Sequence, residues 1–142
     1  MLSPEEIRDL NESYRQDFNR HDANSLRQYY ADHVNWTNPG SLQPISDADE
    51  IPQQYAPLFV SFPDIKLQFV DDFSEGYHNA HHWIMRGTND GPIEVGGQIF
   101  KATRKCIVLK GLSMLILNAE GKIVADHTYY DPSSINKQLG VG

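Results

Sequence analysis

The first part of the chain has apolar side chains at helical spacing. Ile7, Leu10, Tyr14 and Phe18 follow one another at steps of three and four, which places them on one side of a helix. The segment Ser3–Glu6 ahead of them contains a capping serine, an early proline and a glutamate at the capping-box position. The pattern therefore predicts a first helix that begins at residue 4.

Two shorter helices are predicted before the strands begin. One carries the aromatic pair Tyr29 and Tyr30. The other is capped by Asp47 and reaches Phe59, and Pro57 should kink or end it, because proline lacks the N–H that a helix interior needs.

After residue 64 the apolar positions repeat every second residue, which is typical of strands. A short alternating segment also precedes the turn signal Asn38-Pro39-Gly40. We expect a bulge or bend near Gly111, in the longest strand. The predicted strands cover residues 33–37, 65–69, 77–88, 98–117 and 122–130.

Helices followed by strands in hairpins indicate an α+β domain. We predict a curved antiparallel sheet with the N-terminal helices packed on its concave face, giving a cone-shaped molecule. The length of 142 residues matches one domain, so residues 1–142 are predicted to form a single unit. Where the sheet curves away from the first helix, a cavity for a small ligand is expected.

Charge and composition argue against several classes of partner. The net charge is −7 and the basic residues are scattered, which is not the footprint of a nucleic-acid binder. No apolar run approaches the roughly 20 residues of a membrane span, and the start of the chain does not resemble a secretory signal. A cytoplasmic protein without nucleic-acid or membrane partners is predicted. The lone Cys106 lies in an apolar run and is expected to be a buried, inert thiol.

The histidines at positions 78, 81 and 82 do not fit a metal site. On a strand, His78 and His82 share a face but lie about 13 Å apart, which is too far for one ion. The glycine pair at 96–97 is not followed by a helix and does not fit a phosphate-binding loop. We therefore predict no metal and no cofactor.

Three segments are similar to those of a known family. They are Gly121–Asp131 followed by Gln138-Leu139-Gly140, the turn Asn38-Pro39-Gly40, and the tryptophan strand Trp83–Gly91. In this order and spacing the chain resembles SnoaL-like polyketide cyclases over nearly its whole length. The resemblance implies the nuclear-transport-factor-2-like fold, which is a cone of helices and curved sheet, and a homodimer formed through the outer face of the sheet.

The resemblance also implies a reaction. Characterised cyclases of this family close a ring by intramolecular aldol condensation without metal or cofactor. An aspartate on the last strand acts as general acid and base, and a histidine on the neighbouring strand assists it. Counting from the Gly-Lys-Ile turn, Thr128 and Met114 occupy these two positions, so the chain departs from the family pattern at both.

Asp126 is the candidate catalytic base, because it lies two residues before Thr128 and faces the same side of a strand. His82 or His81 would assist it, while Tyr14 and Thr128 would donate hydrogen bonds to a developing oxyanion. We expect the substrate to contact Tyr14, Phe18, Trp36, Tyr55, Phe59, Trp83, Arg86, Met114 and Thr128.

The sequence leaves open which face of the strand 77–88 lines the cavity. If Arg86 faces it, a pair with Asp126 would favour activation of water, as in epoxide hydrolases; otherwise Arg86 is a solvated or interface residue. Two functions also stay open. One is a cofactor-free cyclase, isomerase or hydrolase acting on a small, largely apolar oxygenated molecule. The alternative is a non-catalytic scaffold that binds a small molecule or forms a dimer.

Overall fold

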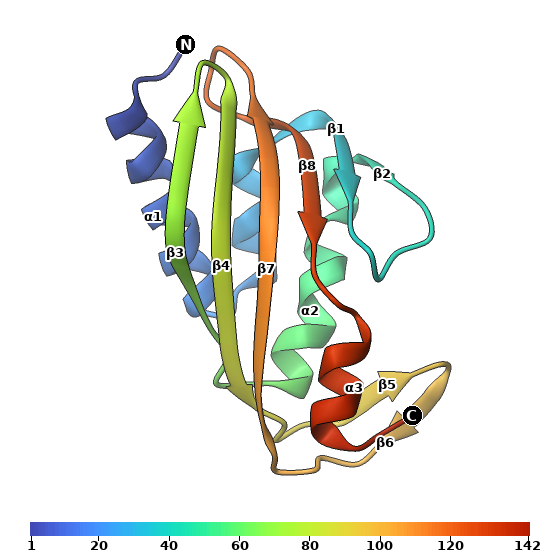
Figure 1. Cartoon of the computed structure of the whole chain (residues 1–142). Helices are drawn as coiled ribbons and strands as arrows, with labels where there is room; N and C mark the ends of the chain where they lie inside the picture. The colour runs from blue at the N-terminus through green and yellow to red at the C-terminus, as the bar shows by residue number, and fades with distance from the viewer.

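Six strands form one curved sheet, with the helices α1 and α2 behind it in the view of Figure 1. The computed structural model describes residues 1–142, and the strand order is β2-β1-β8-β7-β4-β3. The strands are β1 (Tyr30–Thr37), β2 (Ile45–Asp47), β3 (Lys66–Glu75), β4 (His78–Thr88), β7 (Cys106–Leu117) and β8 (Ile123–Tyr129), with β5 (Ile93–Val95) and β6 (Gln98–Phe100) in a separate hairpin. The helices are α1 (Pro4–Asn19), α2 (Pro52–Ser61) and α3 (Ser133–Leu139), and the 3₁₀ helices are η1 (Ala23–Tyr29) and η2 (Ala48–Glu50).

The predicted α+β class is confirmed, with one change to the sheet. β1 runs parallel to β8, whereas the other neighbouring strands are antiparallel, so the sheet is mixed. Parallel strands need a long connection, and here α2 and four strands of the sheet lie between β1 and β8 in the chain. Hairpin patterns along the sequence do not report such a distant pairing.

The helices differ from the prediction at several places. The second predicted helix is the 3₁₀ helix η1, and the helix predicted from Asp47 divides into η2, which Asp47 caps, and α2. α1 begins where predicted, and Ser3 Oγ accepts a hydrogen bond from the backbone N–H of Glu6 at 3.1 Å. Pro57 does not end α2, which continues to Ser61. Its ring lies on the exposed side of the helix, and its missing N–H removes only one backbone hydrogen bond. The C-terminal helix α3 was not predicted; it ends at Gly140, whose φ of 72° is in the left-handed region.

The predicted strands are confirmed in part: β2 and β5 were not predicted, and the bounds of several others move. β3 continues past a register shift after Phe69 and reaches Glu75, whereas the segment 98–117 divides into β6 and β7. The bulge expected near Gly111 is absent, since β7 pairs with β4 without a shift. Gly111 instead lies under the ring of Trp83, where a Cβ atom would come within 2.1 Å of the indole. The glycine thus lets this tryptophan lie flat on the sheet.

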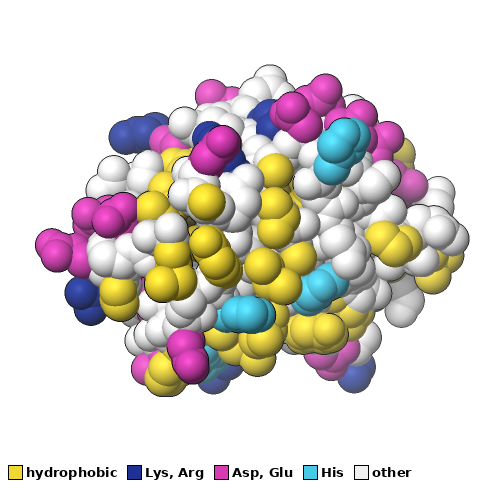
Figure 2. Space-filling model, turned by 90° about the horizontal axis from the view of Figure 1, so that it is seen from above, with side chains coloured by type: hydrophobic (Ala, Val, Ile, Leu, Met, Phe, Trp, Pro, Cys, Tyr) yellow, Lys and Arg dark blue, Asp and Glu magenta, His cyan; other side chains and the backbone are white.

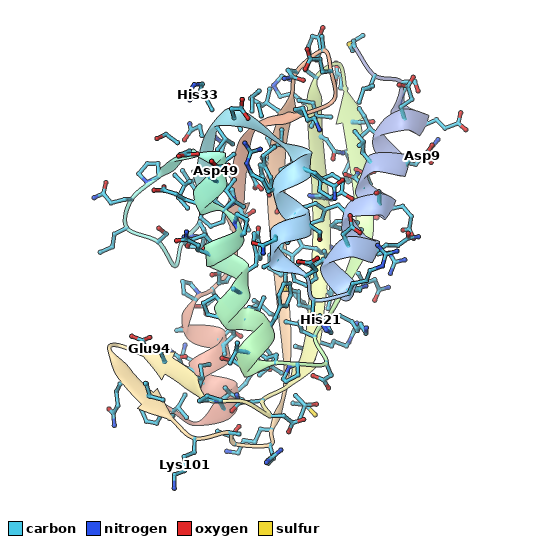
Figure 3. All side chains as sticks on the ribbon, turned by 180° about the vertical axis from the view of Figure 1, so that it is seen from behind. Asp9, His21, His33, Asp49, Glu94 and Lys101 are labelled. Carbon is cyan, nitrogen blue, oxygen red and sulfur yellow. The ribbon has the colours of Figure 1, made fainter.

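The two layers enclose the core between α1, α2 and the concave face of the sheet, which Figure 3 shows from behind. Asp9 on α1 points away from the sheet in this view, whereas Ile7 and Phe18 on the same helix are buried. The prediction of a buried Cys106 was wrong. This residue begins β7 on the outer face, where its Sγ lies 3.6 Å from Thr88 Oγ1.

The convex side of the sheet carries exposed apolar side chains. We call this group the outer patch: Phe73 on β3, Val108, Leu112, Met114 and Ile116 on β7, and Tyr129 on β8. Figure 2 looks along the strands from the top of Figure 1 and shows hydrophobic side chains across the middle and lower part of this end of the molecule, with acidic ones mostly toward the edges. None of the helices has the length and apolar character needed to cross a bilayer.

Candidate active site

A cavity of about 280 Å³ lies between α1, α2 and the concave face of the sheet. Hydrophobic side chains make up 19 of its 29 lining residues, so it suits a largely apolar molecule. No lysine or arginine lines it, and Asp126 is its only acidic residue. The charge inside the cavity therefore depends on this one carboxyl group.

Asp126 points inward from β8 and is only 5% exposed. The Tyr30 hydroxyl donates to its Oδ2 at 3.0 Å, and Thr128 Oγ1 donates to its Oδ1 at 2.9 Å. Burial raises the pKa of Asp126 from 3.8 to about 6, although both hydrogen bonds and the nearby charge of His127 act in the opposite direction. The carboxyl group can therefore exchange a proton close to neutral pH.

Three tyrosines from three different elements line the cavity together with this carboxyl group, and one of them donates to it. Tyr14 comes from α1, Tyr30 from the start of β1 and Tyr55 from α2. Burial raises the pKa of Tyr55 to about 12 and those of Tyr14 and Tyr30 well above the ordinary value, and the charge of Asp126 adds to the increase. All three hydroxyls thus keep their protons and can act as hydrogen-bond donors. Beside them, the buried Trp36 Nε1 lacks a hydrogen-bond partner within 3.5 Å.

His81 is the only histidine that lines the cavity. It is 6% exposed, its ring stacks on Phe69 with centroids 4.3 Å apart, and its Nδ1 is buried without a partner. Burial lowers the pKa of His81 to about 4, against the opposing charge of Asp72. The imidazole is therefore neutral at physiological pH. In the sheet it lies two strands from Asp126, which is a lateral distance of about 10 Å.

Comparison with family models identifies the chain. Residues 11–125 match the model of the SnoaL-like domain, which is most of the sequence. The chain belongs to the SnoaL-like family. No curated protein gives a significant match.

Solved structures with the same fold are related to this SnoaL-like chain at low sequence identity. IdmH, a putative polyketide cyclase from Streptomyces antibioticus, has a TM-score of 0.76 at 23% identity, covering 95% of this chain and 99% of its own. SalBIII, an epoxide hydrolase/cyclase-like enzyme in pyran ring formation, has a TM-score of 0.75 at 11% identity, and the match covers 94% of this chain and 97% of SalBIII. A hypothetical protein with a ketosteroid isomerase-like fold from Catenulispora acidiphila, in complex with trimethylamine, has a TM-score of 0.73 at 16% identity, and the match covers 99% of this chain and 96% of that protein. At these identities the likeness shows the fold.

Most of the predicted site residues of this SnoaL-like domain lie together in one cavity. Asp126 and His81 line it, but they do not form the expected pair, because the hydrogen-bond partners of Asp126 are Tyr30 and Thr128. The predicted contact residues that line it are Tyr14, Phe18, Trp36, Tyr55, Trp83 and Thr128.

Four predicted site residues lie outside this cavity. His82 and Arg86 point to the outer face, because side chains alternate along β4 and those of His81 and Trp83 point inward. There Arg86 donates to Gln68 Oε1 at 3.2 Å. The side chains of Met114 and Phe59 are likewise absent from the lining: Met114 belongs to the outer patch and is 44% exposed, and Phe59 packs behind Phe18 with ring centroids 5.1 Å apart.

Sequence reasoning missed several polar residues of the site. Tyr30 was assigned to a helix, although its place at the start of β1 brings its hydroxyl to Asp126. Asn38 was treated only as a turn residue, but it lines the cavity and accepts from the Tyr130 hydroxyl at 2.9 Å. Ser113 was overlooked because counting from the Gly-Lys-Ile turn led to its neighbour Met114. No group of three or more His, Cys, Asp or Glu residues that could hold a metal ion is found.

Proposed function

We propose that this SnoaL-like protein binds a small, largely apolar, oxygenated molecule in the cavity and moves a proton on it, with Asp126 as the base. The observation that carries the proposal is the buried Asp126 carboxyl group, with a pKa of about 6, among protonated tyrosine hydroxyls. A base needs a pKa near the working pH, and an oxyanion needs donors beside it. The absence of Lys and Arg from the lining favours a neutral ligand.

The proposed reaction begins at a carbon atom next to a carbonyl group. Asp126 removes a proton from this carbon, and the electron pair of the broken C–H bond moves to the carbonyl oxygen to give an enolate. The hydroxyl groups of Tyr14 and Tyr55 donate to the enolate oxygen. Where a C=C bond adjoins the enolate, return of the proton from Asp126 to the far carbon of this dienolate gives isomerisation. Attack of the enolate carbon on a second carbonyl forms a C–C bond and closes a ring, and the resulting alkoxide takes the proton back from Asp126. Activation of water by an Asp126–Arg86 pair is not part of the proposal, because Arg86 lies on the outer face.

The test is proton exchange in a panel of neutral ketones and β-keto esters, from single rings to fused rings. Each compound is incubated with the protein in deuterated buffer, and loss of the proton signal is followed by NMR. We expect exchange above the buffer rate for at least one compound, with a rate that rises with pH through about 6 as Asp126 ionises. Binding without exchange would support the non-catalytic alternative. If no compound binds and none exchanges its protons, the proposal is wrong.

We also propose that two copies of the chain pair through the outer patch. Its exposed apolar side chains lie on the same face of the sheet, on β3, β7 and β8, and burying them in a second copy removes them from water. Met114→Lys should therefore shift the protein from dimer to monomer in light scattering after size-exclusion chromatography. Val60→Lys, an exposed apolar residue of α2, is the matched control and should leave the dimer intact. A wild-type monomer at all concentrations would contradict the proposal.

A further inference from the structure

A row of hydrogen bonds crosses three neighbouring strands and ends at Asp126. It begins on β4, where Trp83 Nε1 donates to Ser113 Oγ on β7 at 3.0 Å. Ser113 Oγ lies 2.7 Å from Thr128 Oγ1 on β8, directly opposite in the sheet register. Thr128 Oγ1 then lies 2.9 Å from Asp126 Oδ1. The close approach of Trp83 to Gly111 holds the indole at the start of this row.

The chemistry of the two ends sets the direction of these hydrogen bonds. An indole N–H can only donate, so Ser113 accepts from Trp83. A carboxylate can only accept, so the single hydroxyl proton of Thr128 is used on Asp126. Thr128 has no second proton, and the proton between the two hydroxyls must therefore come from Ser113. All three hydrogen bonds point toward Asp126.

We propose that Trp83, Ser113 and Thr128 are positioning residues that keep Asp126 Oδ1 as a permanent acceptor and make Oδ2 the oxygen that takes up and releases the proton. Protonation of Oδ1 would require the row to reverse. Thr128 would then donate to Ser113, which also accepts from Trp83, and the hydroxyl proton of Ser113 would have no acceptor.

Oδ2 has a different neighbour. The Tyr30 hydroxyl lies 3.0 Å from it and can accept from a protonated Oδ2, while its own proton turns toward the neighbouring hydroxyl of Tyr14. The proton of Asp126 thus lies on the side of the tyrosines, where the proposed oxyanion would form. The catalytic meaning of this arrangement rests on the proposed function, but the position of the proton does not.

Other titratable groups near Asp126 do not decide which of its two oxygens carries the proton. The tyrosines stay protonated at neutral pH, and His81 stays neutral above a pH of about 4. The charge of His127 lowers the pKa of Asp126, and none of the substitutions below replaces this histidine. The groups that face Asp126 are Tyr14 from α1, Tyr30 from β1 and Tyr55 from α2, and His81 from β4 shares its cavity. His127, the next residue on β8, points to the other face of the sheet, where its Nδ1 lies 2.6 Å from Thr37 Oγ1, and it acts on Asp126 only through its charge.

Thr128→Val tests the row, because valine keeps the branched shape of threonine but cannot donate. We expect the pKa of Asp126, followed through the carbon-13 shift of its carboxyl group in the ligand-free protein, to rise by about one unit. Ser113→Ala should raise it less, because Thr128 keeps its proton but loses the polarisation by Ser113. Thr128→Ser should restore the wild-type value. Thr88→Val, at the far end of β4, is the matched control and should leave the pKa of Asp126 unchanged.

Two results would overturn the proposal. One is an unchanged Asp126 pKa in Thr128→Val, even if thermal unfolding shows that this variant is less stable, because the row would then be only structural. The other is an effect of Ser113→Ala that persists in the Thr128→Val background, because members of one row should not act independently. If the pKa moves as expected but no ketone exchanges its protons, the row stands and the proposed function fails.

Discussion

Asp126→Asn is expected to slow proton exchange by roughly a hundred- to ten-thousand-fold and, at the same time, to make the protein more stable at pH 7. The folded-state pKa of about 6 lies above the ordinary value of 3.8, so the folded protein holds a proton that the unfolded chain has released between these pH values. Wild-type stability therefore falls as pH rises from about 4 to about 6 and stays lower above. Two pKa units correspond to about 3 kcal/mol, and asparagine, which is neutral at every pH, removes this penalty.

Asparagine also fits the hydrogen bonds around this position. Its oxygen can accept from Thr128 in place of Oδ1, and its amide group can donate to the Tyr30 hydroxyl in place of Oδ2. Urea unfolding of the wild type and the variant should show a gain of up to about 3 kcal/mol at pH 7 and little gain at pH 3. Asp71→Asn on the exposed outer face is the matched control, with a small effect at either pH. A variant less stable than the wild type at pH 7 would refute the linkage.

The sequence predicted those parts of the fold that depend on residues close together in the chain. The capping serine and the apolar stripe located α1, and the alternation of apolar positions located every strand of the sheet except β2. The parallel contact of β1 with β8 could not be found in this way, because it joins residues about 90 positions apart, such as Trp36 and Asp126. Gly111 was misjudged for a similar reason. Its role is to make room for Trp83, a residue of another strand.

The candidate site shows the same division. Asp126 and Thr128 were placed on one face by the alternation of a strand, and the structure brings them together with a hydrogen bond. Alternation could not decide which face of β4 is inward, because Trp83 and Ile84 are both apolar. The predicted site therefore included residues of both faces, and of these His81 and Trp83 line the cavity whereas His82 and Arg86 do not. Tyr30 reaches Asp126 only because β1 and β8 are neighbours, so its part in the site depends on the pairing that the sequence did not reveal.

Asn89→Ala is expected to lower the free energy of unfolding by roughly 3–5 kcal/mol, because several backbone groups depend on its side chain. Asn89 is 0% exposed and follows β4. Its Nδ2 donates to the carbonyls of Ser61 and Gly91 at 3.1 and 2.9 Å, and its Oδ1 accepts from the N–H and hydroxyl of Thr103 at 2.8 and 2.9 Å. Alanine would leave the carbonyls of Ser61 and Gly91 and both polar groups of Thr103 without these hydrogen bonds, and Ser61 is buried.

Because of the position of Asn89, we expect the loss of its hydrogen bonds to affect the cavity as well. It joins Ser61, the last residue of α2, to the segment before β7, and so holds the helix that carries Tyr55 against the sheet. Urea unfolding measures the stability, and Asn24→Ala, at an exposed position of η1, should change it by less than about 0.5 kcal/mol. A looser α2 should in addition speed amide exchange around Tyr55 more than in β8, because the sheet keeps its own ladder of hydrogen bonds. Equal stability of the two variants would show that the backbone groups find other partners, and the side chain of Asn89 would then not be what holds α2 in place.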